Sequence, residues 1–294
     1  MRGRGKSAES CRLIAEAYEV LSVIQPASVR AVCYQLFNRG VLRGMVKAET
    51  NRVSTQLRDA REAGVIPWSW IVDETREAET ISAWENPEAF VETVKRSYRR
   101  DRWSDQPIRV EVWSEKGTVR GTLAPVLNRF GTTFRVLHGY GSATSVHQVA
   151  QESRREHRGL VALYVGDWDP SGLHMSDVDL PQRLERYGGN VTLTRVALTA
   201  ADIGSALPGF AADSKHGDPR YRWFVTTHGH RCWELDAMNP ANLRTRVADA
   251  IDHFIDQDAW HRADITERAE ADSLSSILSG WPGISRQASK CLPR

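Results

Sequence analysis

The sequence predicts an α/β protein in which a helical N-terminal domain precedes a parallel sheet covered by helices. Helical apolar spacing dominates the first third of the chain, and from residue 108 short apolar runs alternate with longer helical segments. The 294 residues are 41% hydrophobic and include only 12 prolines, which excludes a disordered or collagen-like chain. At about 100 to 200 residues per domain, this length predicts two domains, each with its own core.

Three short helices are expected before the sheet. Apolar residues recur at helical spacing over residues 10–24, and a second helix follows over about residues 27–38. A third begins with Thr50 as its cap and ends at Gly64. Residues 65–72 alternate like a strand, which completes the order of a winged helix-turn-helix whose last helix enters the DNA major groove. A small helical domain with a solvated basic face fits the same pattern.

The rest of the chain divides by composition. A charged connector contains a helix that begins at Asn86 and Pro87 and has a basic end. Four apolar runs then predict the strands of a parallel sheet: 108–113, 134–137, 160–165 and 191–197. The predicted segments are the winged helix 1–72, the connector 73–106, the sheet domain 107–258, and a C-terminal helix and tail 259–294.

Acidic residues follow two of the predicted strands at the point where each ends. Glu115 comes after the run 108–113, and Asp167 and Asp169 come after the run 160–165. Residues two apart in an extended backbone point the same way, so both aspartates face a carboxylate that arrives from a neighbouring strand. Three carboxylates at one sheet edge predict a Mg²⁺ site suited to phosphodiester chemistry. The alternative is a solvated Asp-Pro-Ser-Gly turn.

These motifs resemble a known domain. A Glu after one strand and Asp-x-Asp after a later one are similar to the Toprim domain of topoisomerases, primases and related nucleases. The resemblance is closest to the topoisomerase VI A subunit and meiotic double-strand-break protein family, over about residues 107–255, and it is weak in the loop 207–222. The motifs that carry it are Glu115-Lys116, Gly139-Tyr140-Gly141-Ser142, the GDWDPSG run 166–172, the RVALT run 195–199 and the ELDA run 234–237.

That family joins its Toprim domain to a winged helix with a catalytic tyrosine, in a stretch reading approximately Ser-x-Arg-Asp-x-Tyr-Tyr. Residues 28–34 fit this frame, which puts Arg30 on the Arg and Tyr34 on the nucleophilic Tyr. Ala31 and Cys33 depart from it. On a helix Arg30 and Tyr34 share a face, so the guanidinium could hold the phosphate that the phenol attacks. In the alternative interpretation Tyr34 belongs to an amphipathic core.

The resemblance implies a mechanism and partners. Tyr34 would attack double-stranded DNA to leave a 5′-phosphotyrosyl bond, assisted by Arg30 and Lys116, while Glu115, Asp167 and Asp169 hold Mg²⁺, with Mn²⁺ as a substitute. Family members act as homodimers, and the A subunit works with a separate ATPase B-type subunit. Two alternatives stay open: a Toprim-type nuclease in which water is the nucleophile, and a winged-helix DNA-binding protein without catalysis.

The remaining features concern location, metals and charge. No apolar run reaches the roughly 18 residues that span a bilayer, and the four separated cysteines fit reduced thiols, so we expect a cytoplasmic protein without membrane contact. His228, His230 and Cys232 alternate on a predicted strand and form a weak zinc candidate without a fourth ligand. The formal charge of +2 is uneven: residues 1–64 carry 11 basic and 6 acidic residues, which predicts DNA contact there.

Overall fold

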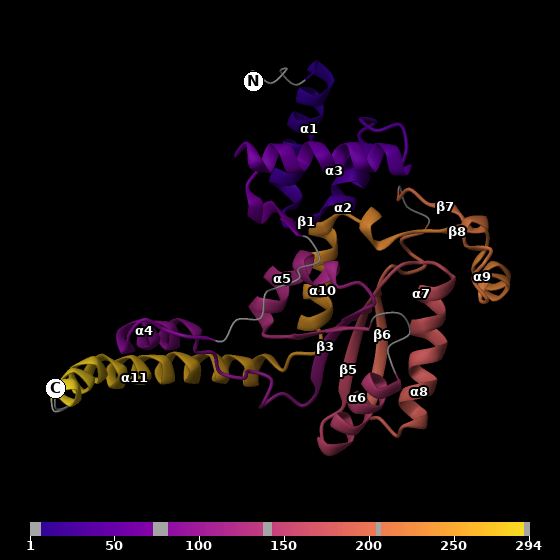
Figure 1. The fold of residues 1–294 in the computed structure, drawn as a ribbon. Helices are drawn as coiled ribbons and strands as arrows, with labels where there is room; N and C mark the ends of the chain where they lie inside the picture. Colours follow the sequence, from indigo (N-terminus) through magenta and orange to yellow (C-terminus); the bar gives the residue numbers. More distant parts are fainter. Residues whose placement is uncertain (1–6, 73–81, 138–142, 204–206, 291–294) are drawn as a thin grey trace. The chain divides into compact units, whose positions relative to one another are not determined.

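The computed structural model describes residues 7–72, 82–137, 143–203 and 207–290, and Figure 1 shows the elements. Two compact units divide the chain. The first combines the described parts of Met1–Thr75 and Ile108–Phe254, and the second combines those of Arg76–Pro107 and Ile255–Arg294. The segment boundaries at residues 72, 106 and 258 remain predictions.

Three helices open the first unit: α1 (Ala8–Ile24), α2 (Val29–Asn38) and α3 (Lys47–Glu62). Ser28 caps α2 by accepting a hydrogen bond from the Ala31 amide at 3.1 Å. The predicted cap of the third helix is wrong. This helix begins three residues before Thr50, whose hydroxyl instead donates to the Lys47 carbonyl at 3.2 Å within the first turn. The cause is the run Lys47-Ala-Glu, because all three residue types favour the helix.

The strand expected over residues 65–72 is also wrong for most of its length. After Pro67 the chain forms a 3₁₀ turn, Trp68–Trp70, and only β2 (Ile71–Val72) is extended. Pro67 fixes its own φ and the Trp70 amide donates back to its carbonyl at 3.1 Å, which closes the turn. The short β2 pairs in parallel with β1 (Ala27–Ser28).

One apolar core joins the three helices and this β pair. Its buried members are Leu13, Ala17, Val20, Leu21, Ile24, Ala27, Ala31, Val32, Cys33, Leu36, Leu42, Val53, Leu57, Ala60, Ile66 and Ile71. Trp70 packs against its edge, whereas Trp68 is 58% exposed and lies under the Arg61 guanidinium. Burial of this apolar set is the main stabilising force for the helical part.

The second part of this unit is a four-stranded parallel sheet in the order β4-β3-β5-β6. Two predicted strands are confirmed at both ends, and the other two are displaced by one residue at their ends. The strands are β3 (Arg109–Ser114), β4 (Thr133–Val136), β5 (Leu160–Val165) and β6 (Val191–Ala197). The α/β fold class is therefore confirmed as a parallel sheet with flanking helices.

Helices cover both faces of the sheet (Figure 1). On one face α6 (Ala143–Arg155) and α8 (Leu180–Arg186) pack on alternate β5 residues, including the fully buried Tyr164. On the other, α5 (Thr118–Phe130) packs against α10 (Pro240–Asp252). With both faces covered, all six β5 residues are buried and functional groups are confined to the strand ends.

Short elements follow β5 and β6. They are α7 (Pro170–His174), the π-helical stretch η2 (Met175–Asp179), β7 (Phe210–Ala211), the 3₁₀ turn η3 (Ala212–Lys215), α9 (Tyr221–His228), β8 (Arg231–Cys232) and the 3₁₀ turn η4 (Leu235–Ala237). β7 and β8 form an antiparallel pair. The Gly139–Ser142 motif lies outside the described residues.

The second unit pairs α4 (Pro87–Ser97) with α11 (Gln257–Lys290). Asn86 caps α4 by accepting from the Ala89 amide at 2.8 Å, as predicted. The basic end of the connector binds α11, where Arg102 donates to Glu267 at 2.8 Å. Within the described residues, no helix combines the length and the apolar character needed to cross a bilayer.

The turn after β5 leaves no space for a side chain at Gly172. A Cβ there would lie 2.5 Å from the Asp167 carbonyl oxygen, which belongs to the backbone and cannot rotate away. We predict that Gly172→Ala lowers the free energy of unfolding by about 1 to 3 kcal/mol, measured by chemical denaturation. The matched control is Gly217→Ala, because that position has nothing within 4 Å. Equal stability of both variants would contradict the close approach.

Candidate functional site

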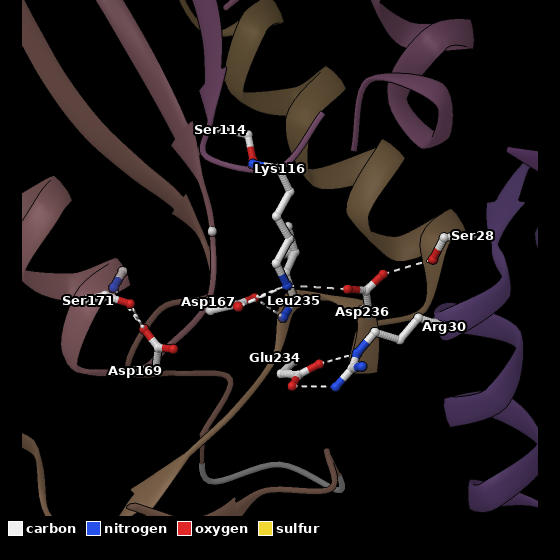
Figure 2. Close-up of polar contacts among 12 residues, drawn as sticks. Ser28, Arg30, Ser114, Lys116, Asp167, Asp169, Ser171, Glu234, Leu235 and Asp236 are labelled. Atoms are coloured by element: carbon white, nitrogen blue, oxygen red, sulfur yellow. Dashed lines mark hydrogen bonds and ion pairs between the residues drawn. The ribbon is translucent and has the colours of Figure 1, made fainter. Parts of the chain in front are cut away.

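The predicted acidic residues meet where the strand order reverses. β3 and β5 are neighbours in the sheet although β4 lies between them in the chain. The crevice at the carboxyl ends of two such strands is where open α/β sheets bind ligands. Glu115 follows β3, and Asp167 and Asp169 follow β5, so all three lie at the carboxyl ends of these strands (Figure 2 shows the two aspartates).

Asp167 is buried, with 6% of its surface exposed. Its carboxylate accepts from the Leu235 amide at 2.8 Å and from Lys116 Nζ at 2.8 and 2.9 Å. Burial raises the pKa of this carboxyl, although the Lys116 charge and the Leu235 amide act in the opposite direction. The carboxylate is therefore held by a buried ion pair that it needs to remain charged.

Asp169 has a structural and an electrostatic partner. Its Oδ1 caps α7 by accepting from the Gly172 amide at 2.7 Å and from the Ser171 hydroxyl at 3.0 Å. Its Oδ2 lies 3.1 Å from Lys215 Nζ, which comes from η3. The two carboxylate oxygens of Asp169 thus have different partners: Oδ1 stabilises the start of α7, and Oδ2 pairs with the Lys215 ammonium.

The pKa of Glu115 is shifted by burial and by both aspartates. Burial and then the charges of Asp167 and Asp169 raise its pKa to about 7. Two lysines, Lys116 and Lys215, oppose that shift. A carboxyl that titrates near neutral pH in a crevice of this kind is a candidate for a functional group.

Lys116 joins two carboxylates at the centre of the site (Figure 2). Besides Asp167, its Nζ contacts Asp236 Oδ2 at 3.4 Å. Burial alone would lower the pKa of Lys116, but Asp167 and Asp236 raise it, so the ammonium remains charged. Asp236 is therefore a partner of Lys116, while Asn239 caps α10.

Arg195 fixes the loop that carries the aspartates. Its guanidinium is 10% exposed and donates to the carbonyls of Asp167 at 3.2 Å and Gly172 at 2.7 Å. The guanidinium carbon also lies 5.0 Å from the Tyr164 ring centroid. Because these are backbone contacts, Arg195 orients both aspartates without binding either carboxylate.

Two contacts connect α2 with this site (Figure 2). The Ser28 hydroxyl donates to Asp236 Oδ1 at 2.8 Å, and Arg30 forms a two-pronged ion pair with Glu234. Asp236 in turn contacts Lys116. The N-terminal end of α2 is therefore connected by hydrogen bonds and ion pairs to Asp167.

Tyr34 lies near Arg30 but away from solvent. The Arg30 guanidinium carbon is 5.9 Å from the Tyr34 ring centroid, so the two side chains share a helix face as predicted. Tyr34 is only 4% exposed, and burial together with the Glu234 charge raises its pKa to about 12. It is one of the buried residues of α2, together with Leu36. The structure thus brings Tyr34 to Arg30 and leaves the phenol protonated at neutral pH.

The donor set fits a divalent cation. Carboxylate oxygens are the ligands that Mg²⁺ prefers, and the pKa of Glu115 is raised first by burial and then by the charges of Asp167 and Asp169. Lys116 and Lys215 form ion pairs with the two aspartates, so the acidic site already attracts positive charge. Within the described residues, however, no three acidic, histidine or cysteine side chains converge closely enough to form a ready metal site.

The zinc candidate lacks the predicted geometry. His228 ends α9, whereas Cys232 lies in β8 beyond a turn, so the three residues do not share a strand face. The His228 ring instead packs between aromatic rings, including Trp168 and Trp223.

Sequence reasoning missed three contributors to the site: Lys215, Glu234 and Arg195 as the loop anchor. Glu234 and Arg195 lie within motifs that the resemblance had marked, so that signal was available. Lys215 lies in the segment where the resemblance is weakest, and no spacing rule connects it to Asp169, which is 46 positions earlier in the chain.

Comparison with models of protein families and with curated proteins found no match. The functional argument therefore depends on the chain's own geometry and on the motif resemblance.

The pKa of Glu115 predicts a pH-dependent stability. Because its pKa is about 7 in the folded protein and about 4.5 when unfolded, the folded state holds the proton more tightly between these values. Without divalent metal, we expect the free energy of unfolding to fall by about 3 kcal/mol more in the wild type than in Glu115→Gln between pH 4.5 and 8.

Denaturant titrations across this pH range measure the effect. The exposed Glu19→Gln is the control, and it should follow the wild type. A pH profile of Glu115→Gln that also follows the wild type would show that Glu115 titrates normally.

Proposed function

We propose that this protein is a Mg²⁺-dependent enzyme that cleaves double-stranded DNA at the acidic site formed by Glu115, Asp167 and Asp169. The observation that carries the proposal is the placement of these acids at the reversal of strand order between β3 and β5. The same sheet order and acid positions support the resemblance to a Toprim domain. The three helices that precede the sheet support the winged helix-turn-helix interpretation. This support is only partial, because the β pair that accompanies the helices is parallel and short.

In the proposed reaction, the acidic residues, Lys116 and Arg195 have different roles. Glu115, Asp167 and Asp169 would hold the metal, which supplies positive charge to the phosphate oxygens of the scissile bond. Lys116 keeps Asp167 ionised and adds a fixed positive charge beside the phosphate. Arg195 maintains the turn so that both aspartates face the crevice.

Two nucleophiles are compatible with this site, and the motif resemblance favours Tyr34. Transesterification would join the Tyr34 phenol oxygen to a DNA phosphorus and release a 3′-hydroxyl. For this step Arg30 must leave Glu234 to bind the phosphate, and the phenol must emerge from its buried position. A homodimer that presents Tyr34 to the partner's acids, assisted by a separate ATPase subunit, would provide such a rearrangement.

Hydrolysis is the second candidate, and the burial of Tyr34 favours it. A phenol that is 4% exposed with a pKa of about 12 is a poor nucleophile at neutral pH. Water needs no movement of α2, and a metal held by the acidic residues would activate it for attack on the phosphorus. In this version Tyr34 and Arg30 position DNA.

Plasmid cleavage tests the proposal. Supercoiled DNA is incubated with wild type, Asp167→Asn or Tyr34→Phe in Mg²⁺ or EDTA, and covalent adducts are trapped with detergent. We predict Mg²⁺-dependent nicking or linearisation that falls on the order of 100-fold in Asp167→Asn, since the variant loses a metal ligand and the partner of Lys116. Exposed Asp249→Asn and Tyr18→Phe are the matched controls and should cleave normally.

The outcome for Tyr34→Phe separates the nucleophiles. Loss of both cleavage and adduct would establish transesterification, whereas full cleavage without adduct would establish hydrolysis. Wild-type protein that cleaves no DNA with Mg²⁺ or Mn²⁺, or an Asp167→Asn variant as active as the control, would contradict the proposal itself.

A further inference from the structure

Lys215 is the cation of the site that is best placed to move. Its ammonium contacts one carboxylate oxygen, Asp169 Oδ2, and its side chain is 40% exposed. Lys116, in contrast, contacts two carboxylates and is 26% exposed. Because Lys215 has one carboxylate partner and its side chain reaches solvent, its contact with the buried Asp169 is more easily exchanged than the contacts of Lys116.

A metal ion and Lys215 would require the same oxygen of Asp169. Oδ1 is already occupied by two donors, the Gly172 amide and the Ser171 hydroxyl, which hold the start of α7. Oδ2 faces Lys215 at 3.1 Å. A cation that binds Asp169 without disrupting the turn must therefore displace the ammonium.

Backbone hydrogen bonds around η3 and β8 hold Lys215 beside Asp169. η3 directly follows β7, and the Ala212 amide donates to the His230 carbonyl at 2.9 Å beside β8. Beyond β8, Trp233 exchanges two backbone hydrogen bonds with Trp168, at 2.8 and 2.9 Å. Trp168 lies between the two aspartates in the chain, so the segment that carries Lys215 is attached to the loop that carries its partner.

We propose that Lys215 is an exchangeable counter-cation of the acidic site, which pairs with Asp169 until a divalent metal binds and then contacts a phosphate of the bound DNA. The inference rests on the proposed function. Four carboxylates, those of Glu115, Asp167, Asp169 and Asp236, share two ammonium groups, so the site retains an excess of two negative charges when Glu115 is ionised. A divalent cation balances this excess, and the released ammonium becomes available to an anionic substrate.

Calorimetric titration with Mn²⁺, without DNA, tests the first half. We expect Lys215→Gln to bind Mn²⁺ about fivefold more tightly than the wild type, because the metal no longer competes with an ion pair. Lys215→Arg should retain the competition, and Lys95→Gln, which removes a lysine from α4, is the matched control. Equal or weaker Mn²⁺ binding by Lys215→Gln would overturn the inference and make Lys215 a structural support of Asp169.

Binding of a short fluorescent DNA duplex tests the second half. With Mn²⁺, Lys215→Gln should bind the duplex more weakly than the wild type. The magnitude of the slope of log K against the logarithm of the salt concentration should also decrease by about one. In EDTA both proteins should bind alike, since Lys215 then remains with Asp169. A loss of affinity that is equal in EDTA and Mn²⁺ would overturn the exchange.

The proposed function fails in a different way. Wild-type protein that binds no Mn²⁺, with Asp167→Asn indistinguishable from it, would contradict the metal site itself. Metal binding that is lost in Asp167→Asn but unchanged in Lys215→Gln would contradict only the role of Lys215.

Discussion

The structure of the site depends on the repulsion between carboxylates that the parallel sheet brings together. Glu115 and Asp167 leave neighbouring strands at the same edge, and Asp169 follows two residues later. Such a group is stable in a partly buried crevice only when cations or protons balance it. Lys116 provides the buried cation, and Glu115, with its raised pKa, provides the position that takes up a proton. A divalent metal would serve the same balance, which is why the arrangement suits metal-dependent phosphodiester chemistry.

The same charges connect the helical part of the first unit to the sheet. Asp236 contacts both Lys116 and Ser28, and the adjacent Glu234 holds Arg30. A series of contacts therefore runs from Asp167 through Lys116 and Asp236 to the start of α2, the helix that carries Tyr34. Under the proposed function, DNA or metal that disturbs these contacts would act on the helix that holds the buried Tyr34.

The sheet strands, the position of the acidic residues and one helix cap could be predicted from the sequence, because each depends on residues that are close together in the chain. The six consecutive apolar residues of β5 predicted both ends of a buried strand, and the Asp-x-Asp that follows had to lie at its carboxyl end. The helix cap at Asn86 depends on one residue and its neighbours, and it was also correct. The parallel topology then placed Glu115 beside the aspartates.

Features that depend on distant contacts could not be predicted. Residues 65–72 alternate like a strand, but Pro67 and the packing of Trp70 on the helical core produce a 3₁₀ turn. His228 fits a strand pattern, yet aromatic neighbours make it the end of a helix. The contact of Lys215 with Asp169 depends on how a segment without periodic pattern folds back through β7 and β8. The functional charges of the site thus include one that only the fold specifies.

Crystallography of the protein soaked in Mn²⁺, with anomalous data collected at the manganese edge, would locate a metal bound at the acidic site. We expect a manganese peak at the carboxyl ends of β3 and β5, about 2.1 Å from carboxylate oxygens of Asp167, Asp169 and Glu115, with Lys215 displaced from Asp169. An absence of manganese from this edge, with Lys116 and Lys215 still bound to the aspartates at saturating Mn²⁺, would contradict the proposed metal site.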